Sequence, residues 1–457
     1  MAYAVVKTEA TSSRFRTAAS AEWRALMNWL LVWVVLANTG FAVTYFFGSP
    51  PRYAEIVLFG VVGLLVRNKP YWLQCGSFMA VMLYSVLSFI AGLFNLAITS
   101  LAHSLVFFAE LNIGQSLEYI LGSITLFGFV AAACLALRRP TAFESSKMTA
   151  IAGVITLALA AFDFYMSMGM RGHYERVPNA NAPFESAFEQ AGVPDGTSPL
   201  DRNLVIIMVE SLGVPTDNQE MSRLLFARFQ DKDVARRFEV SSGTTTYFGS
   251  TTAGEIRELC GRWGEYHALT SERDDTCLPA RLAQAGAPTT AYHSFEGTFF
   301  DRHLWYPNIG FEKTAFRDDL VERGASKCGG VFPGACDRDI PRQIADQLKS
   351  TNEPQFIYWL TVNAHLPVPL EGNLETENCK RVSRKLADEY PMICRQFAIW
   401  DTVDNALAGE LLQDDFPPTD ILIVGDHMPP YFDRHSRAQF APDRVPWIVL
   451  KWRERVE

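Results

Sequence analysis

A run of small hydroxyl residues at 249–255, GSTTAGE, precedes a stretch with a helical pattern. Thr252 and Glu255 have the Ser/Thr-x-x-Glu spacing of a capping box, which predicts Thr252 as the N-cap of a helix over 253–260. Thr251 is then not needed as a cap, and its hydroxyl is expected beside the positive end of the helix. A hydroxyl activated there can act as a nucleophile. The alternative is that all of these residues only cap the helix or turn the chain.

Three apolar runs each end in side chains that can bind metal or phosphate. Glu210 ends the first run, His365 the second, and Asp426 with His427 the third. Glu210, Asp426 and His427 form a ligand set suited to Zn²⁺ or Mn²⁺, and a bound divalent cation can activate a hydroxyl at neutral pH. The alternative is a solvated strand end at Glu210 and a capped turn at Asp426. Because several strand ends carry such groups together, we favour one shared site.

The same three runs predict the elements that bring these residues together. They cover 203–210, 356–365 and 420–427, and their uninterrupted Val, Ile and Leu content is typical of central strands in a covered parallel sheet. Helical patterns at 337–350 and 394–412 fall between them, so the alternation predicts an α/β domain with a central, mostly parallel sheet. Ligands bind at the carboxyl ends of the strands in such sheets, where the candidate residues stand.

Composition divides the 457 residues into unlike parts. A chain of this length is expected to hold more than one domain. Residues 1–170 are almost all apolar and predict a transmembrane domain, 171–200 resemble a juxtamembrane connector, and 201–457 have the mixed charges of a soluble catalytic domain. The net charge of -9 argues against nucleic acid as a partner, because nucleic acid requires a basic face.

Five apolar segments of the first part predict five membrane-spanning helices. They lie between Arg24 and Arg52, at 54–66, between Pro70 and Phe108, at 119–137, and at 148–170, where Asp163 interrupts the last. The segment at 54–66 is short and is the weakest candidate. Lys and Arg gather before the first segment and after the second and fourth, so the positive-inside rule predicts a cytoplasmic amino terminus. Five spans then place everything after Met170 outside the cytoplasm.

Six of the eight cysteines lie in the soluble part and fall as three close pairs along the chain. An even number of such cysteines predicts disulfides in an oxidising compartment, although the sequence leaves their connectivity open. The alternative is a zinc site, but no CxxC spacing occurs. The other two, Cys75 and Cys134, fall in the predicted spans, where a thiol is compatible with apolar surroundings.

Five motifs in order resemble those of the membrane-anchored phosphotransferases of the alkaline phosphatase and sulfatase superfamily. They are NLVIIMVESLG, GSTTAGE, AYHSFEGTFFDRHLWYPNIGFEK, LTVNAHLP and GDHMPP, spread over roughly residues 200–450. That group includes lipoteichoic acid synthases, phosphoglycerol transferases of periplasmic glucans and phosphoethanolamine transferases. The resemblance implies an alkaline-phosphatase-like α/β domain joined to a five-span anchor.

The resemblance also implies roles for individual residues. Glu210, Asp426 and His427 match metal ligands of the group, together with Thr251, which matches the nucleophilic threonine. His365 matches a histidine near the transferred phosphate, able to protonate a leaving alkoxide or to deprotonate an acceptor.

Three further residues match positions that contact the substrate in the group. His293 and Arg302 match those that hold the substrate phosphate, for which the two parallel donors of an arginine are suited. For Arg302 the alternative is a surface ion pair with Asp301. Phe300 stands where the lipoteichoic enzymes have a tryptophan beside the glycerol head group, and this difference leaves the head group open.

The resemblance implies transfer of a phosphoglycerol or phosphoethanolamine head group from phosphatidylglycerol or phosphatidylethanolamine, through a phospho-threonine, to a glycan or polysaccharide hydroxyl. It also implies a divalent metal, Zn or Mn, and a catalytic domain in the periplasm of a multi-pass protein of the bacterial inner membrane. Two alternatives stay open: an exported phosphodiesterase or phosphatase with water as the acceptor, and a catalytically inactive membrane scaffold of an export system. Threonine at 251 argues against the sulfatase branch itself, whose enzymes convert a Cys or Ser to an aldehyde.

Overall fold

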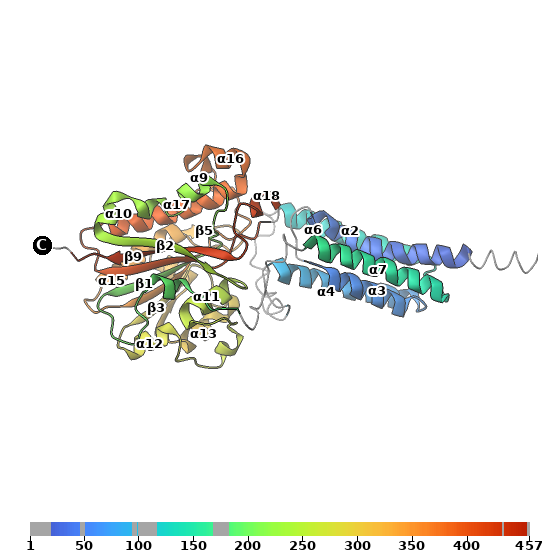
Figure 1. The fold of residues 1–457 in the computed structure, drawn as a ribbon, viewed down its shortest axis with the longest axis horizontal. Coiled ribbons are helices and arrows are strands. Elements are labelled where there is room, and N and C mark those ends of the chain that lie inside the picture. Colours follow the sequence, from blue (N-terminus) through green and yellow to red (C-terminus); the bar gives the residue numbers. More distant parts are fainter. Residues whose placement is uncertain are drawn as a thin grey trace, which may run out of the picture. The chain divides into compact units, whose positions relative to one another are not determined.

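The computed structural model describes residues 20–45, 51–93, 98, 117–167, 182–431 and 434–454. The chain divides into two compact units, one helical and one α/β (Figure 1). The helical unit draws its described residues from 20–93 and 117–167. The α/β unit contains the described residues from 182 to 454.

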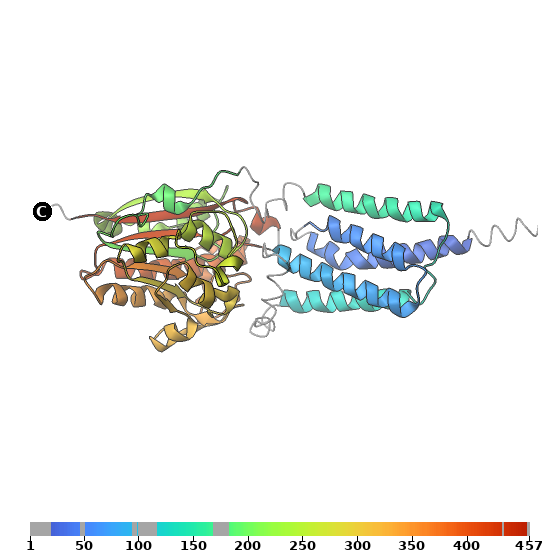
Figure 2. The same cartoon turned by 90° about the horizontal axis from the view of Figure 1, so that it is seen from below.

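The helices of the first unit run side by side (Figure 2). A helical run from residue 20 continues through the π-helical turns of η1 (Leu31–Leu36) into α2 (Ala37–Tyr45); it is followed by α3 (Tyr53–Val66), α4 (Tyr71–Leu93), α6 (Leu117–Ala136) and α7 (Ser146–Ser167). Three helices in the described residues, Ser20–Ala42, Tyr71–Ala91 and Ser146–Met166, are long and apolar enough to cross a membrane. The shorter apolar helices Tyr53–Val66 and Leu121–Ala136 correspond to the second and fourth predicted spans. The prediction of five spans therefore stays unconfirmed for these two.

Large apolar side chains cover the outside of the helical unit. Trp72, Phe127 and Tyr165 are each about 70% exposed (69%, 72% and 72%). Inside the unit the helices approach closely, since a Cβ on Gly63 of α3 would lie 2.5 Å from the ring of Trp33. An apolar outer surface of this extent is unfavourable in water and is typical of helices in contact with lipid.

Asp163 of α7 points into the helical unit. Its carboxylate Oδ2 accepts a hydrogen bond from the backbone N–H of Arg52 at 2.7 Å, immediately before α3 begins. The guanidinium of Arg52 in turn donates to Ser85 Oγ at 2.7 Å and lies 3.5 Å from the centre of the Phe41 ring. The charged residue that interrupts the last predicted span thus joins α7 to the start of α3.

The α/β unit is built on a seven-stranded sheet in the order β2-β9-β8-β1-β7-β3-β4. The strands are β1 (Asn203–Val209), β2 (Phe238–Thr246), β3 (Thr289–His293), β4 (Lys313–Ala315), β7 (Phe356–Leu360), β8 (Thr419–Gly425) and β9 (Arg444–Trp452). β8, β1, β7, β3 and β4 are parallel, while β9 pairs antiparallel with β8 and β2. The predicted mostly parallel sheet is confirmed.

The three predicted strands are the central neighbours β8, β1 and β7. Their register pairs Met208 with Leu360 and Val209 with Gly425, so the three chains leave the sheet at the same level. Every residue of β1, β7 and β8 is buried, which explains why their sequences lack the polar alternation of a half-exposed strand.

Helices cover both faces of the sheet, with α10 and α17 on one side and α12 and α13 on the other (Figure 1). Five of these helices are α11 (Thr251–Cys260), α12 (Leu278–Gln284), α13 (Arg302–Asn308), α15 (Ile340–Lys349) and α17 (Pro391–Leu411), of which α11 and α13 carry site residues. The remaining described helices are α8 (Ala187–Ala191), α9 (Gln219–Leu224), α10 (Lys232–Arg237), α14 (Arg317–Glu322), α16 (Arg384–Glu389) and α18 (Arg434–Arg437). α8 lies within 171–200, the segment expected as a connector, and its Phe188 is buried in the core of the α/β unit.

All six cysteines of the α/β unit form disulfides, as predicted, and each bonds to its neighbour along the chain. The pairs are Cys260–Cys277, Cys328–Cys336 and Cys379–Cys394. The first joins the end of α11 to the start of α12. Because these thiols are bonded to each other, they are not zinc ligands.

Candidate metal and nucleophile site

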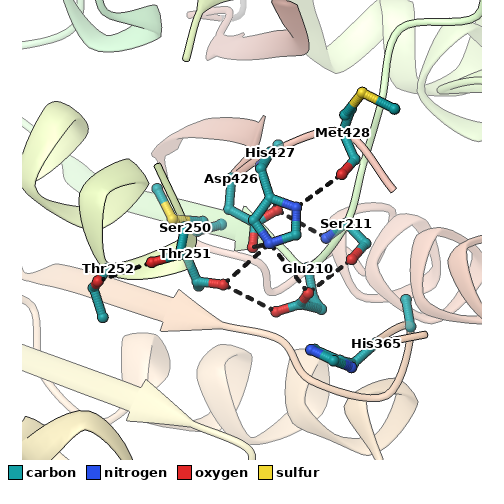
Figure 3. A network of polar contacts seen from close by, with 12 residues as sticks. Glu210, Ser211, Ser250, Thr251, Thr252, His365, Asp426, His427 and Met428 are labelled. Atoms are coloured by element: carbon teal, nitrogen blue, oxygen red, sulfur yellow. Dashed lines mark hydrogen bonds and ion pairs between the residues drawn. The ribbon is translucent and has the colours of Figure 1, made fainter. Parts of the chain in front are cut away.

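The ends of β1 and β8 and the start of α11 bring four predicted site residues together (Figure 3). Thr251 Oγ1 lies 3.4 Å from Glu210 Oε2 and 3.4 Å from His427 Nε2. Glu210, Asp426 and His427 offer ligand atoms that all lie within 4.8 Å of one another. Residues up to 217 positions apart in the sequence thus share one small space.

The predicted capping box is wrong. α11 begins at Thr251, its N-cap is Ser250, and no side chain caps it. Thr252 Oγ1 instead contacts Ser250 Oγ at 3.2 Å, and the carboxylate of Glu255 pairs with a buried arginine on α13. Local spacing favoured a cap, but a buried charge elsewhere needed the same carboxylate. The correction leaves Thr251 in the first turn of the helix, where its hydroxyl is not used for capping.

Backbone N–H groups hold the carboxylate of Asp426, and a serine hydroxyl holds that of Glu210. Asp426 Oδ1 accepts hydrogen bonds from the N–H groups of Ser211 (2.8 Å) and His427 (2.6 Å), and Glu210 Oε1 accepts one from Ser211 Oγ (2.8 Å). Ser211 reaches Asp426 because its backbone has a φ of 56°, a left-handed conformation that costs energy in a residue with a side chain. Strained backbone at this turn holds Glu210 and Asp426 side by side.

Burial and mutual repulsion dominate the electrostatics of the cluster. Burial raises the pKa of the Glu210 carboxyl. Burial and the charge of Glu210 raise the pKa of Asp426 to about 6. Burial alone would lower the pKa of His427, but the charges of Asp426 and Glu210 outweigh it and raise the pKa. Two acids forced together in a site away from water gain from a positive group placed between them.

The residues fit a divalent cation. Asp426 Oδ2 is buried and accepts no hydrogen bond from the described residues. His427 Nδ1 donates to the carbonyl oxygen of Met428 at 2.9 Å, so the ring presents the lone pair of Nε2 to Glu210 and Thr251, an arrangement typical of metal-binding histidines. Two carboxylates, one imidazole and one hydroxyl are donors that Zn²⁺ and Mn²⁺ accept.

His365 follows β7 and lies near the cluster (Figure 3). Its Nδ1 donates to the carbonyl oxygen of Leu366 at 2.8 Å, which makes Nε2 a hydrogen-bond acceptor. Burial and the charge of His427 lower the pKa of His365 to about 4. At neutral pH the imidazole is therefore neutral, and the lone pair at Nε2 can accept a hydrogen bond from a hydroxyl.

Arg302 opens α13 and is almost completely buried. It pairs with Glu255 rather than with Asp301: its Nε and Nη2 lie 3.1 and 2.7 Å from Glu255 Oε2. The other oxygen of Glu255 accepts hydrogen bonds from Tyr306 (2.5 Å) and Tyr358 (3.2 Å). The charge of Arg302 partly offsets the burial that raises the pKa of Glu210, so Arg302 lies within electrostatic reach of the metal ligands.

Glu255→Gln is expected to lower the free energy of unfolding by about 3–5 kcal/mol, because Arg302 would stay buried without a counter-charge. Glu220→Gln is the control, since Glu220 pairs with the largely exposed Arg223 and such pairs contribute about 0–1 kcal/mol. Denaturant titration of both variants measures the difference. Equal small losses would contradict the assignment of Glu255 as the partner of Arg302.

His293 and Phe300 both lie near Arg302: His293 is affected by its charge, and the ring of Phe300 lies next to its guanidinium. Burial and the charge of Arg302 lower the pKa of His293 well below its usual value. Its Nδ1 contacts the carbonyl oxygen of Leu360 at 3.3 Å, so Nδ1 carries the proton and Nε2 is an acceptor. Phe300 is half-buried, has a φ of 55°, and its ring centre lies 5.4 Å from the Arg302 guanidinium.

Sequence reasoning missed the residues that hold α11 against the end of β8. A Cβ on Gly254 would lie 3.2 Å from both the Cα and the carbonyl oxygen of Asp426. On the next turn, buried Arg257 donates to the carbonyl oxygens of Gly425 (2.8 Å) and Asp426 (3.3 Å) and pairs with buried Glu258. The absence of a side chain at 254 within a helix was the available signal.

Gly254→Ala is expected to destabilise the protein by about 1–3 kcal/mol, because the added methyl pushes α11 away from Asp426. Gly409→Ala in α17 is the matched control. There a Cβ meets nothing within 4 Å, and the change should stabilise by about 0.5–1 kcal/mol. Thermal unfolding compares the two. A Gly254→Ala protein that melts at or above the wild-type temperature would disprove the close approach.

Comparisons with known proteins place this site in a family. The model of the Sulfatase family matches residues 202–449. Solved structures with similar folds include the lipoteichoic acid synthase LtaP of Listeria monocytogenes (TM-score 0.42, 16% identity, covering 60% of this chain and 70% of that one). Another is the phosphoglycerol transferase GacH of Streptococcus pyogenes, solved with sn-glycerol-1-phosphate (TM-score 0.37, 16% identity, covering 56% of this chain and 69% of that one).

A third structure spans both units of the chain. It is the lipooligosaccharide phosphoethanolamine transferase EptA of Neisseria meningitidis (TM-score 0.48, 13% identity, covering 93% of this chain and 88% of that one). No curated protein matches the sequence. The family match covers more than half of the 457 residues and contains all eight predicted site residues. The chain belongs to the Sulfatase family.

Proposed function

We propose that the protein is a divalent-metal-dependent phosphotransferase. It moves the phosphoglycerol or phosphoethanolamine head group of a membrane phospholipid through a phospho-threonine at Thr251 to a glycan hydroxyl. The observation that supports this most is the position of Thr251 Oγ1, 3.4 Å from both Glu210 and His427 at the start of α11. Such a hydroxyl has the surroundings of a nucleophile and no capping role.

Glu210, Asp426, His427 and Thr251 would hold the cation. When bound, Zn²⁺ or Mn²⁺ would lower the pKa of the Thr251 hydroxyl and offset charge on the phosphate oxygens. The helix amides at the start of α11 favour negative charge at the same place. Arg302 adds a permanent positive charge nearby, and Glu255 holds its guanidinium in one orientation.

In the first half of the reaction, Thr251 Oγ bonds to the phosphorus of the phosphodiester and the bond to the diacylglycerol oxygen breaks. The threonine proton ends on diacylglycerol, which leaves. In the second half, the acceptor oxygen bonds to phosphorus and the bond to Thr251 breaks, which restores the hydroxyl. His365 is neutral and has an acceptor at Nε2. Its pKa of about 4 makes it a weak base, so we assign it to accept the hydrogen bond of the acceptor hydroxyl and to relay that proton to the threonine oxygen as the new bond to phosphorus forms.

The helical unit supports a lipid as the donor. Its outer surface carries exposed Trp72, Phe127 and Tyr165, as expected of helices in lipid. We place residues 1–170 in the bacterial inner membrane with five spans, 171–200 as the juxtamembrane connector and 201–457 in the periplasm. Three disulfides in the α/β unit support an oxidising compartment. A catalytic unit joined to a membrane anchor is confined to the surface that carries the donor lipid.

The test is diacylglycerol release by the purified full chain in detergent or vesicles. Vesicles contain phosphatidylglycerol or phosphatidylethanolamine, and the protein is loaded with Zn²⁺ or Mn²⁺ or treated with a chelator. Release from one lipid that depends on metal is the expected result, and it identifies the donor. If an added glycan acceptor gains no head group and free head group accumulates instead, the protein is a hydrolase. No release from either lipid with either metal overturns the proposal.

A further inference from the structure

A short disulfide-closed segment lies against the chain that carries His365. Cys328 and Cys336 close residues 328–336, and β5 (Lys327–Cys328) pairs with β6 (Gly334–Ala335) as a two-stranded hairpin that begins one residue before the closed segment. Asp337 follows directly. The segment is packed without space to spare, since a Cβ on Gly334 would lie 2.4 Å from the carbonyl oxygen of Ser294.

Asp337 and Asn363 hold each other across two chain segments. Asp337 Oδ2 accepts hydrogen bonds from the backbone N–H groups of Val362 (3.0 Å) and Asn363 (2.7 Å). In return, Asn363 Oδ1 accepts one from the backbone N–H of Asp337 (2.8 Å), and its amide donates to the Ala335 carbonyl (3.2 Å). These four bonds fix the turn that ends at His365, whose own N–H donates to the Val362 carbonyl at 3.1 Å.

Phe332, at the centre of the closed segment, contacts the imidazole itself. The two ring centres lie 4.4 Å apart at an interplanar angle of 85°. Phe332 also packs with Phe295 and Val362 in a small buried cluster. The segment therefore holds both the backbone beneath His365 and one side of its ring.

We propose that Phe332, in the disulfide-closed segment 328–336, and Asp337, which follows it directly, are positioning residues for His365. The inference rests on the proposed function for what His365 does, but its geometry stands by itself. Asp337 fixes the backbone position of the turn that carries His365, and Phe332 restricts the rotation of the imidazole. Small displacements of a group that transfers protons cost rate rather than binding. Losing these contacts therefore lowers kcat and leaves KM unchanged.

The activity test is a double-mutant cycle on the metal-loaded full chain. Phe332→Ala should lower kcat about tenfold, and Phe332→Leu, which keeps apolar bulk, should recover most of it. In a His365→Ala background, Phe332→Ala should cause no further loss, because both changes act on the same group. Asp337→Asn should retain activity that Asp337→Ala loses, since an amide oxygen still accepts both N–H bonds. Losses that multiply in the double variant overturn the proposal.

A second measurement needs no lipid and is independent of the reaction. Diethyl pyrocarbonate modifies accessible neutral imidazoles, and mass spectrometry of peptides gives the rate at His365 relative to exposed His303. That ratio should rise in Phe332→Ala and in Cys328→Ser/Cys336→Ser, but not in the control Cys379→Ser/Cys394→Ser, which opens a different disulfide. An unchanged ratio overturns the positioning role. If the ratio rises but wild type releases no diacylglycerol, only the proposed function fails.

Discussion

Thr251→Ala is expected to lower turnover on the order of 10⁴-fold or more, because it removes the oxygen that is assigned to form the covalent intermediate. Thr251→Ser keeps a hydroxyl at the same place and should retain measurable activity. The protein should still fold and bind metal, since Glu210, Asp426 and His427 remain. Diacylglycerol release per enzyme, measured at saturating lipid, gives the turnover of each variant relative to wild type.

Thr252→Ala is the matched control for this prediction. Thr252 is one residue away and fully buried, but its hydroxyl contacts Ser250 rather than the metal ligands. Losing that contact should cost about 1 kcal/mol of stability and leave turnover within a few-fold of wild type. If Thr252→Ala were the inactive variant and Thr251→Ala the active one, the nucleophile would have been assigned to the wrong hydroxyl.

Asp426→Asn is expected to stabilise the folded protein when no metal is present and to make it less stable than wild type when metal is bound. In chelator-treated protein, burial and the charge of Glu210 raise the pKa of Asp426 to about 6 from 3.8. Between these values the folded state binds a proton that the unfolded state has lost, so wild-type stability falls as the pH rises through this window. A shift of about two pKa units corresponds to about 3 kcal/mol. The variant, which does not ionise, should match wild type near pH 4 and exceed it above pH 7.

Added Zn²⁺ or Mn²⁺ should reverse the order of the two stabilities, so that wild type becomes more stable than Asp426→Asn. Metal that binds only the folded state raises the melting temperature of wild type, while the variant lacks a ligand and gains little. Asp388→Asn, an exposed acid on α16, should follow wild type under both conditions. Calorimetry or fluorescence melting across pH values, with and without metal, measures both arms. A wild-type protein that metal does not stabilise would contradict the assigned ligand set.

The sequence predicted the central sheet of the fold, and it named residues that the structure brings close together. Three apolar runs predicted central strands of a parallel sheet, and strand ends in such a sheet face the same edge. Glu210, Asp426 and His427 therefore meet in the structure as expected, with Thr251 beside them. Cysteine spacing likewise predicted three disulfides, although only the coordinates show that each cysteine bonds to its nearest neighbour.

Prediction from the sequence failed where a side chain has one possible partner nearby in the chain and another far away in the chain. Glu255 stands at the right spacing to cap α11, but it binds Arg302, 47 positions away, because a buried guanidinium must be neutralised. Nothing in the local pattern shows that Arg302 is buried. The same holds for Arg257, which looks like an ordinary surface residue of a helix but holds the carbonyl of Gly425.

The number of membrane spans could not be settled from apolar content. The segment 54–66 is fully apolar in its middle but forms a helix of only 14 residues, Tyr53–Val66. A bilayer core needs about 20 residues of helix. Length and hydropathy support three membrane-spanning helices. The prediction that the other two helices also span the membrane rests on the basic residues in the loops.

The most direct test of the central claim is the mass of the peptide that contains Thr251. The metal-loaded full chain is mixed with phospholipid vesicles without acceptor, quenched in acid and digested, with Thr251→Ala and Thr252→Ala treated alongside. A phosphoglycerol or phosphoethanolamine group on Thr251 in wild type and in Thr252→Ala, and none in Thr251→Ala, is the predicted result. Diacylglycerol release by a protein whose Thr251 peptide never carries the group would contradict the account.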